Sequence, residues 1–171
     1  DMKKLATILF ILTILPIAAA AQPAEVQNII SKYSGKDGIT SVSFTDPTSV
    51  FSLIDSPELE QALKDVKLIK ILNCHNLETN SEGKSLTEDL KSLSTPSGFK
   101  EWMSVSEKGA DVRIMIKKNG AKVEELLMKA FNKTGTTMIW ISGDIDLNKV
   151  KSLKDLISGP KRNKIKPKVK K

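Results

Sequence analysis

The sequence predicts an α+β fold in which helices cover a mainly antiparallel sheet. Apolar residues recur at helical spacing in several segments of the first half, whereas the second half changes to a period of two. Residues 101–143 form four short segments separated by KG, NG and KTG turns, which is typical of an antiparallel meander. We therefore expect a C-terminal four-strand meander that is joined by one or two earlier strands.

The first half is expected to begin with a helix, a strand, a second helix and a second strand. Helical spacing predicts a helix over residues 24–33, and alternation predicts a strand over residues 39–45. Ser56 and Pro57 then form a helix-start signature. The mostly apolar run over residues 66–74 is the candidate central strand, because its composition is typical of a strand covered on both faces.

Two further helices are expected on either side of the meander. Ser85 and Glu88 have the spacing of a capping box, which starts a helix that Pro96 breaks. After the meander, Asp146 is expected to cap a last helix whose apolar positions run to Ile157, where a Gly-Pro pair stops it.

Within the meander, an Asn-Gly pair gives the clearest hairpin signal. The segment 123–131 also suits a helix, but its position between two turns favours a strand. Val112, Ile114 and Ile116 alternate with more polar neighbours, so one face of the sheet is packed and we expect the helices to cover it. The expected strands span residues 101–106, 112–118, 122–131 and 136–143.

The first 21 residues have the features of an export signal. Two lysines give a positive start, residues 5–17 are mostly apolar, and four alanines end the segment. A membrane anchor is the alternative, but Pro16 interrupts the apolar stretch, which is shorter than the roughly 20 residues that a span needs. We expect cleavage before Gln22 and an exported product that is periplasmic or associated with the outer side of the inner membrane.

The chain length of 171 residues, with 40% hydrophobic and 27% charged residues, fits one globular domain. We accordingly divide the chain into a signal peptide over residues 1–21, a single α+β domain over residues 22–160 and a disordered basic tail over residues 161–171.

The formal net charge of +7 comes from the C-terminal end. Residues 161–171 hold seven basic and no acidic residues, so the domain itself is nearly neutral and a nucleic-acid partner is not expected. Near an anionic membrane each charge can contribute about 1 kcal/mol; a solubilising tail without a dedicated partner is the simpler alternative. The candidate residues for binding an anionic surface are Lys161, Arg162, Lys164, Lys166, Lys168, Lys170 and Lys171.

The sequence offers few residues for catalysis. One His and one Cys exclude a disulfide scaffold and a multi-Cys zinc module, and the glycine pair at residues 35–38 lacks the pattern of a phosphate-binding loop. Cys74 is expected to be buried or unpaired. Because Cys74 and His75 are adjacent in a predicted strand, they should point to opposite faces and not act as a pair. No catalytic residue, metal ligand or cofactor is therefore assigned.

Asp144 and Asp146 are two residues apart and could present paired carboxylates to a cation or for acid–base chemistry. The favoured interpretation is structural: Gly143 ends a strand and Asp146 caps the following helix. Trp102 and Trp140 are candidates for a contact surface, although packing in the core is the favoured interpretation for both.

Several stretches resemble a known family. The leader, YSGKDGITSVSF, MSVSEKGADVRIMIKKNGAKVEELL and WISGDIDLNKV are together similar to small exported bacterial proteins, common in Bacteroidetes and classed as a domain of unknown function. The resemblance covers roughly residues 1–157. It implies a signal-bearing, periplasmic or membrane-associated domain with a sheet and flanking helices, and no established activity, cofactor or catalytic residue.

These observations favour a non-enzymatic binding or regulatory module of the cell envelope, with an envelope protein as its partner. The alternative is an envelope enzyme or metal-binding protein that uses Asp144 and Asp146. A concave pocket that holds Asp144 together with His75 would favour this alternative.

Overall fold

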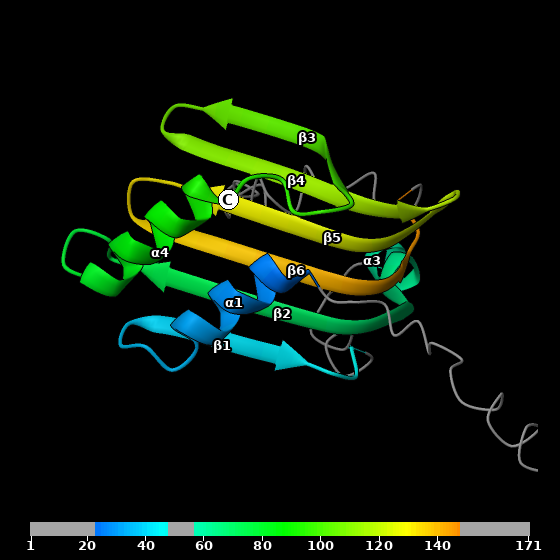
Figure 1. Cartoon of the computed structure of the whole chain (residues 1–171), viewed down its shortest axis with the longest axis horizontal. Helices are drawn as coiled ribbons and strands as arrows, with labels where there is room; N and C mark the ends of the chain where they lie inside the picture. The colour runs from blue at the N-terminus through cyan, green and yellow to red at the C-terminus, as the bar shows by residue number, and fades with distance from the viewer. Residues whose placement is uncertain (1–22, 48–56, 148–171) are drawn as a thin grey trace, which may run out of the picture.

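The computed structural model describes residues 23–47 and 57–147 and contains a six-stranded antiparallel sheet with a few helices (Figure 1). The strand order is β1-β2-β6-β5-β4-β3. The strands are β1 (Ile39–Phe44), β2 (Asp65–His75), β3 (Phe99–Glu107), β4 (Ala110–Asn119), β5 (Lys122–Phe131) and β6 (Gly135–Ile145). The helices are α1 (Ala24–Tyr33), α3 (Pro57–Leu63) and α4 (Ser81–Ser92).

The predicted meander is confirmed, because β3, β4, β5 and β6 are neighbours in chain order and every pair is antiparallel. Two earlier strands extend it, with β2 pairing with β6 and β1 forming the edge. The ambiguous segment, β5, is a strand: β4 and β6 pair with it on both sides, and its side chains alternate between the two faces. The candidate central strand, β2, is an interior strand that lies next to the β1 edge.

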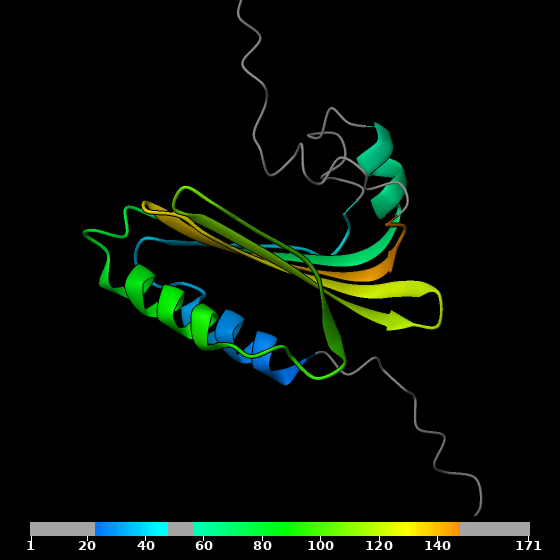
Figure 2. The same ribbon diagram turned by 90° about the horizontal axis from the view of Figure 1, so that it is seen from above.

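The two faces of the sheet pack separately. Helices α1 and α4 lie against one face, which we call the helix face, where Leu72, Leu127 and Trp140 form a core with the buried sides of the two helices (Figure 2). Val112, Ile114 and Ile116 belong to another cluster on the opposite, second face. Of the helices expected to cover these three residues, only α3 joins the same cluster within the described ranges, through Leu63. Helices α1 and α4 pack on the other face, toward which the alternation in β4 directs Met115.

The predicted helix forms as α4, but its N-cap lies five residues before Ser85, so the capping-box prediction is wrong. Asn80 is the N-cap, and its side-chain oxygen accepts a hydrogen bond from the Gly83 N–H at 2.9 Å. Gly83 lies in the first turn, where an added Cβ would come within 2.3 Å of the Cys74 sulfur. Because Gly83 has no side chain, α4 can pack closely on β2. Ser85, the predicted cap, lies inside the helix.

Strand β6 does not end at Gly143, contrary to the prediction, but continues to Ile145. Gly143 has a φ of 137° and lies opposite the irregularity in β2 between Val66 and Leu68. A Cβ at position 143 would lie 2.6 Å from the Cα of Val66. The glycine is therefore required by the close approach of β2 and not by the end of a strand.

The remaining sequence predictions lie outside the described residues: the signal peptide, the Ser56 cap, the last helix beyond Leu147 and the basic tail. Within the described ranges, no helix has the length and apolar character needed to cross a membrane.

Candidate functional site

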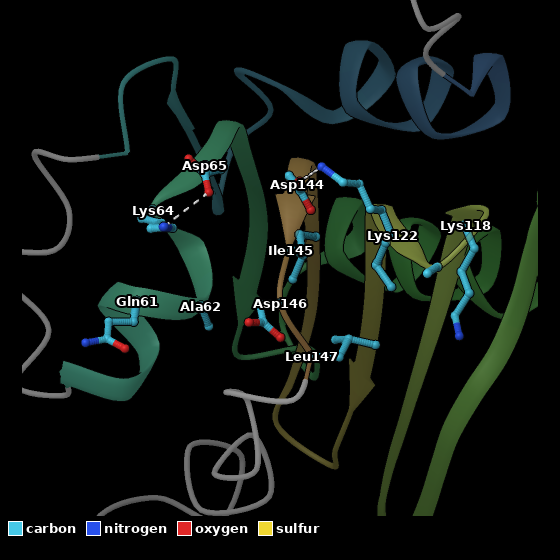
Figure 3. A pocket seen from close by; sticks show the side chains of 12 residues that line it. Gln61, Ala62, Lys64, Asp65, Lys118, Lys122, Asp144, Ile145, Asp146 and Leu147 are labelled. Carbon is cyan, nitrogen blue, oxygen red and sulfur yellow. Dashed lines mark hydrogen bonds and ion pairs between the residues drawn. The ribbon is translucent and has the colours of Figure 1, made fainter.

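A pocket of about 420 Å³ lies where α3, the start of β2, the β4–β5 turn and the end of β6 meet (Figure 3). It contains both predicted carboxylates, Asp144 and Asp146. The Asp144 carboxylate forms an ion pair with the ammonium group of Lys122, and this contact raises the pKa of Lys122. Asp144 is therefore a partner of a surface lysine across the β5–β6 pair.

The surroundings of this pocket mix both signs of charge. Lys64 forms an ion pair with Asp65 at 3.8 Å, and Lys118 also lines the pocket. Nowhere in the part of the chain that the structure describes do three His, Cys, Asp or Glu side chains gather as ligands of a metal ion would. The pocket can hold a small polar molecule between charged side chains, but the described residues give it no base paired with a nucleophile.

His75 lies at the other end of the sheet. In the β2–β6 pairing, Asp65 is opposite Asp144, whereas His75 is opposite Gly135, ten residues further along β2. At about 3.4 Å per residue this separates His75 from Asp144 by roughly 30 Å. The ring of His75 is instead within hydrogen-bond distance of the Asn73 amide, at 2.8 Å. Among the described residues, no pocket therefore holds Asp144 together with His75, the arrangement that would have favoured the enzyme alternative.

Cys74 and His75 point to opposite sides of β2, as predicted. Cys74 is fully buried on the helix face, while His75 is exposed. Burial raises the pKa of the Cys74 thiol, because the charged thiolate is disfavoured away from water. A thiol that remains protonated is a poor nucleophile.

Two buried charged residues on the helix face were not singled out from the sequence, and the first is Glu125. It is 3% exposed, and its two oxygens accept hydrogen bonds from the Lys117 ammonium at 2.8 Å and the Trp140 indole N–H at 3.0 Å. Trp140 is fully buried, so its predicted place in the core is confirmed. The signal in the sequence was the alternation of β5, which places Glu125 on the same side as Leu127.

The second residue is Lys129, which is 4% exposed. Its ammonium group donates hydrogen bonds to the carbonyls of Leu90 at 3.0 Å and Leu93 at 2.9 Å, at the C-terminal end of α4. These carbonyls have no partner within the helix, and a cation there also interacts favourably with the helix dipole. Burial, followed by the nearby charge of Arg113, lowers the pKa of Lys129. Lys129 thus fixes α4 to the sheet.

A third polar contact joins the two helices of the helix face. The Asp89 carboxylate on α4 accepts hydrogen bonds from Lys32 and from the buried Tyr33 of α1, both at 2.7 Å. The contact with Lys32, and then that with Tyr33, lowers the pKa of Asp89. Like Lys129, these groups stabilise the packing of the helices, whereas Glu125 joins β5 to β4 and β6 within the sheet.

Trp102 lies in β3 and is 42% exposed, so the expectation that it packs in the core is wrong. The pairing of β3 with β4 is irregular at this point: Glu101 is opposite Met115 and Met103 is opposite Ile114, which leaves Trp102 without a partner in the register. A residue added to one strand in this way is a β-bulge, which redirects side chains. The bulge explains why the side chain of Trp102 is exposed and does not follow the alternation of the strand.

Comparison with known proteins identifies a family but no activity. No curated protein and no solved structure was found to match the chain. The family model described as "Domain of unknown function (DUF4252)" matches residues 33–153, which is more than half of the sequence and includes all six strands. The chain therefore belongs to the DUF4252 family of domains of unknown function.

Proposed function

We propose that this protein is an exported, non-enzymatic binding module of the cell envelope, and that it contacts a protein partner through the β3 edge with Trp102 as the anchor. The observation that carries the proposal is the exposure of Trp102 on a bulge of an edge strand. Tryptophan is enriched among the residues that dominate the binding energy of protein interfaces.

The β3 edge is better suited to binding one specific partner than to pairing non-specifically with other strands. No other strand among the described residues pairs with the outer side of β3. Lys100, Glu101 and Glu107 place charges along this strand, and charges together with a bulge are the usual protection of an edge against random pairing. A partner that fits the bulge can add a strand or an aromatic-binding surface here, with Trp102 giving the apolar contact.

The β1 edge is the natural comparison. Its sequence, ITSVSF, has no charge and no proline, and its pairing with β2 is regular. It lacks an exposed aromatic anchor, so it serves as the control surface for the proposal.

Export is part of the same proposal and rests on the leader over residues 1–21. The basic tail over residues 161–171 adds a second, electrostatic contact with an anionic membrane surface. Such binding to anionic vesicles should weaken with salt and be lost on truncation after Gly159. Mass spectrometry of the protein from its host should find Gln22 at the N-terminus; an intact leader in the cytoplasm would overturn the envelope assignment.

Photo-cross-linking in the native host tests the contact. A photoreactive residue at position 100, next to Trp102 on β3, should form an adduct with the partner, and Trp102→Ala should abolish it. The same photoreactive residue at Thr40 on β1 is the matched control and should give no such adduct. Because Trp102 is 42% exposed, Trp102→Ala should lower the free energy of unfolding by no more than about 2 kcal/mol and leave the protein folded.

Adducts that persist in Trp102→Ala, or that form equally from position 40, would contradict the role of the β3 edge. A loss of cross-linking that is accompanied by unfolding would count against Trp102 as a surface anchor.

A further inference from the structure

The second face of the sheet is an apolar surface whose covering layer is incomplete within the described residues. Ile139 and Ile141 of β6 lie on this face and are only half-buried, as is Met128 of β5. The described helix that packs with this face is α3, which lies at one end of it (Figure 2). The side chains of the cluster are Leu63, Val66, Ile69, Val112, Ile114, Ile116, Val123, Leu126 and Ile145, with Phe44, Ile71, Met103, Met128, Ala130, Ile139, Ile141 and Leu147 packed against it.

The chain itself leaves the described region at this face. Strand β6 ends at Ile145, which belongs to the second-face cluster, and Leu147 packs against the same cluster. Between them, the Asp146 N–H donates a hydrogen bond to the carbonyl of Ala62 in α3 at 3.2 Å. The residues that follow Leu147 therefore start beside α3, at the edge of the apolar surface.

These following residues have the pattern of a helix with one apolar side. Leu147, Val150, Leu153 and Ile157 recur at helical spacing, while the positions on the other side, such as Asp155, are polar. The DUF4252 match continues to residue 153, past the last described residue, so the start of this segment belongs to the family domain.

The length of such a helix also fits the extent of the second face. An 11-residue helix over residues 147–157 is about 16 Å long at 1.5 Å per residue. Strand residues rise about 3.4 Å each, so a helix of this length that turns back from the end of β6 would cover about five residues of β6 and reach the level of Ile141. It would lie over β6, with β2 and β5 on either side and β4 next in the sheet. These four strands contribute the aliphatic centre of the second face.

We propose that residues 147–157 dock as an amphipathic helix across the second face, with Val150, Leu153 and Ile157 against β6 and β5. The sheet is then enclosed between α1 and α4 on one side and this helix with α3 on the other. The burial of aliphatic side chains drives the docking, since the second-face cluster consists of hydrophobic residues. The basic residues from Lys161 onward stay outside the docked helix and remain accessible.

Truncation of the chain at two positions tests the docking. Truncation after Leu147 removes the proposed helix and the tail, whereas truncation after Gly159 removes the tail alone and is the matched control. We expect the shorter protein to bind a hydrophobic dye with several-fold higher fluorescence and to unfold at a clearly lower urea concentration. The control should match the full chain in both measurements.

Cross-linking locates the helix without depending on a truncated protein. In the full chain, Leu153→Cys combined with Ile141→Cys should be joined by a short bismaleimide, because Ile141 is the half-buried residue of β6 nearest to the middle of the docked helix. Asp155→Cys combined with Ile141→Cys, which places the helix thiol on the polar side, should be joined poorly. A shorter protein that fails to fold would thus leave the cross-linking result to decide.

The proposal is overturned if the two truncated proteins show equal dye binding and equal urea midpoints, or if the Leu153→Cys and Asp155→Cys variants cross-link equally to position 141. It is also overturned if the full chain forms a dimer that buries Ile139, because the occupant of the second face would then be a second copy. Binding of the full chain to neutral lipid vesicles through the second face would also overturn the proposal, because the occupant of this face would then be a membrane.

Discussion

The two faces of the sheet differ in how they are stabilised. On the helix face, buried charged groups are placed between the aliphatic residues, and each has polar partners: Glu125 with Trp140, and Lys129 with the end of α4. The second-face cluster is built from apolar side chains. Hydrogen bonds depend on direction, whereas aliphatic contacts do not. The Lys129 contacts therefore fix α4 in one orientation on the sheet, and Asp89 links α1 to α4.

The largest effect should come from a pair of neighbouring substitutions on the two faces. Trp140→Ala removes a fully buried side chain and one hydrogen bond to Glu125, and should lower the free energy of unfolding by about 3–5 kcal/mol. Ile139→Ala removes a smaller side chain and no side-chain hydrogen bond, so it should cost less, about 2–3 kcal/mol even beneath the proposed helix. Urea unfolding measures both. Equal losses would mean that the two faces are equally well packed.

A smaller effect is expected from Lys129→Met, which keeps the volume of the side chain but removes the contacts with the end of α4. The loss should be about 1–3 kcal/mol at neutral pH. Because burial lowers the pKa of Lys129, the unfolded chain binds more protons between this lowered value and the ordinary 10.5. The stability of the natural protein should therefore rise relative to the variant as the pH increases through this window.

Urea unfolding at several pH values measures this difference, with Lys133→Met as the control for the loss of one exposed positive charge. Parallel pH curves for the natural protein and Lys129→Met would show that burial does not perturb the lysine, and would weaken the distinction between the faces.

The smallest effect is expected from Asp89→Asn, at the contact between α1 and α4. The pKa of Asp89 is lowered by Lys32 and Tyr33, so its contribution is present above the ordinary value of 3.8 and is lost as the pH falls through the folded-state pKa. Since the ion pair is more than one-third exposed, the contribution should be less than about 1 kcal/mol. The acid unfolding curve of Asp89→Asn should flatten relative to that of Glu88→Gln. Identical curves would remove Asp89 from the polar contacts of the helix face.

Local patterns in the sequence determined much of this fold. The helix over residues 24–33 and the strand over residues 122–131 have the predicted bounds, and the hairpin at Gly120 forms where expected. Such features depend on spacing along the chain and on turn chemistry, which act between residues close in sequence. The isolation of Cys74 from His75 was likewise predictable, because neighbours in a strand point to opposite faces.

Tertiary structure decided what local patterns could not. The face that α1 and α4 cover is set by contacts between these helices and strands that are far away in sequence. The pattern of Val112, Ile114 and Ile116 therefore indicated a packed face, but not which helices pack on it. The exposure of Trp102 follows from a bulge in the pairing of two strands. The sequence alone determined which segments form helices and strands, since local spacing sets them; the register, bulges and buried charges were decided only when distant segments packed together.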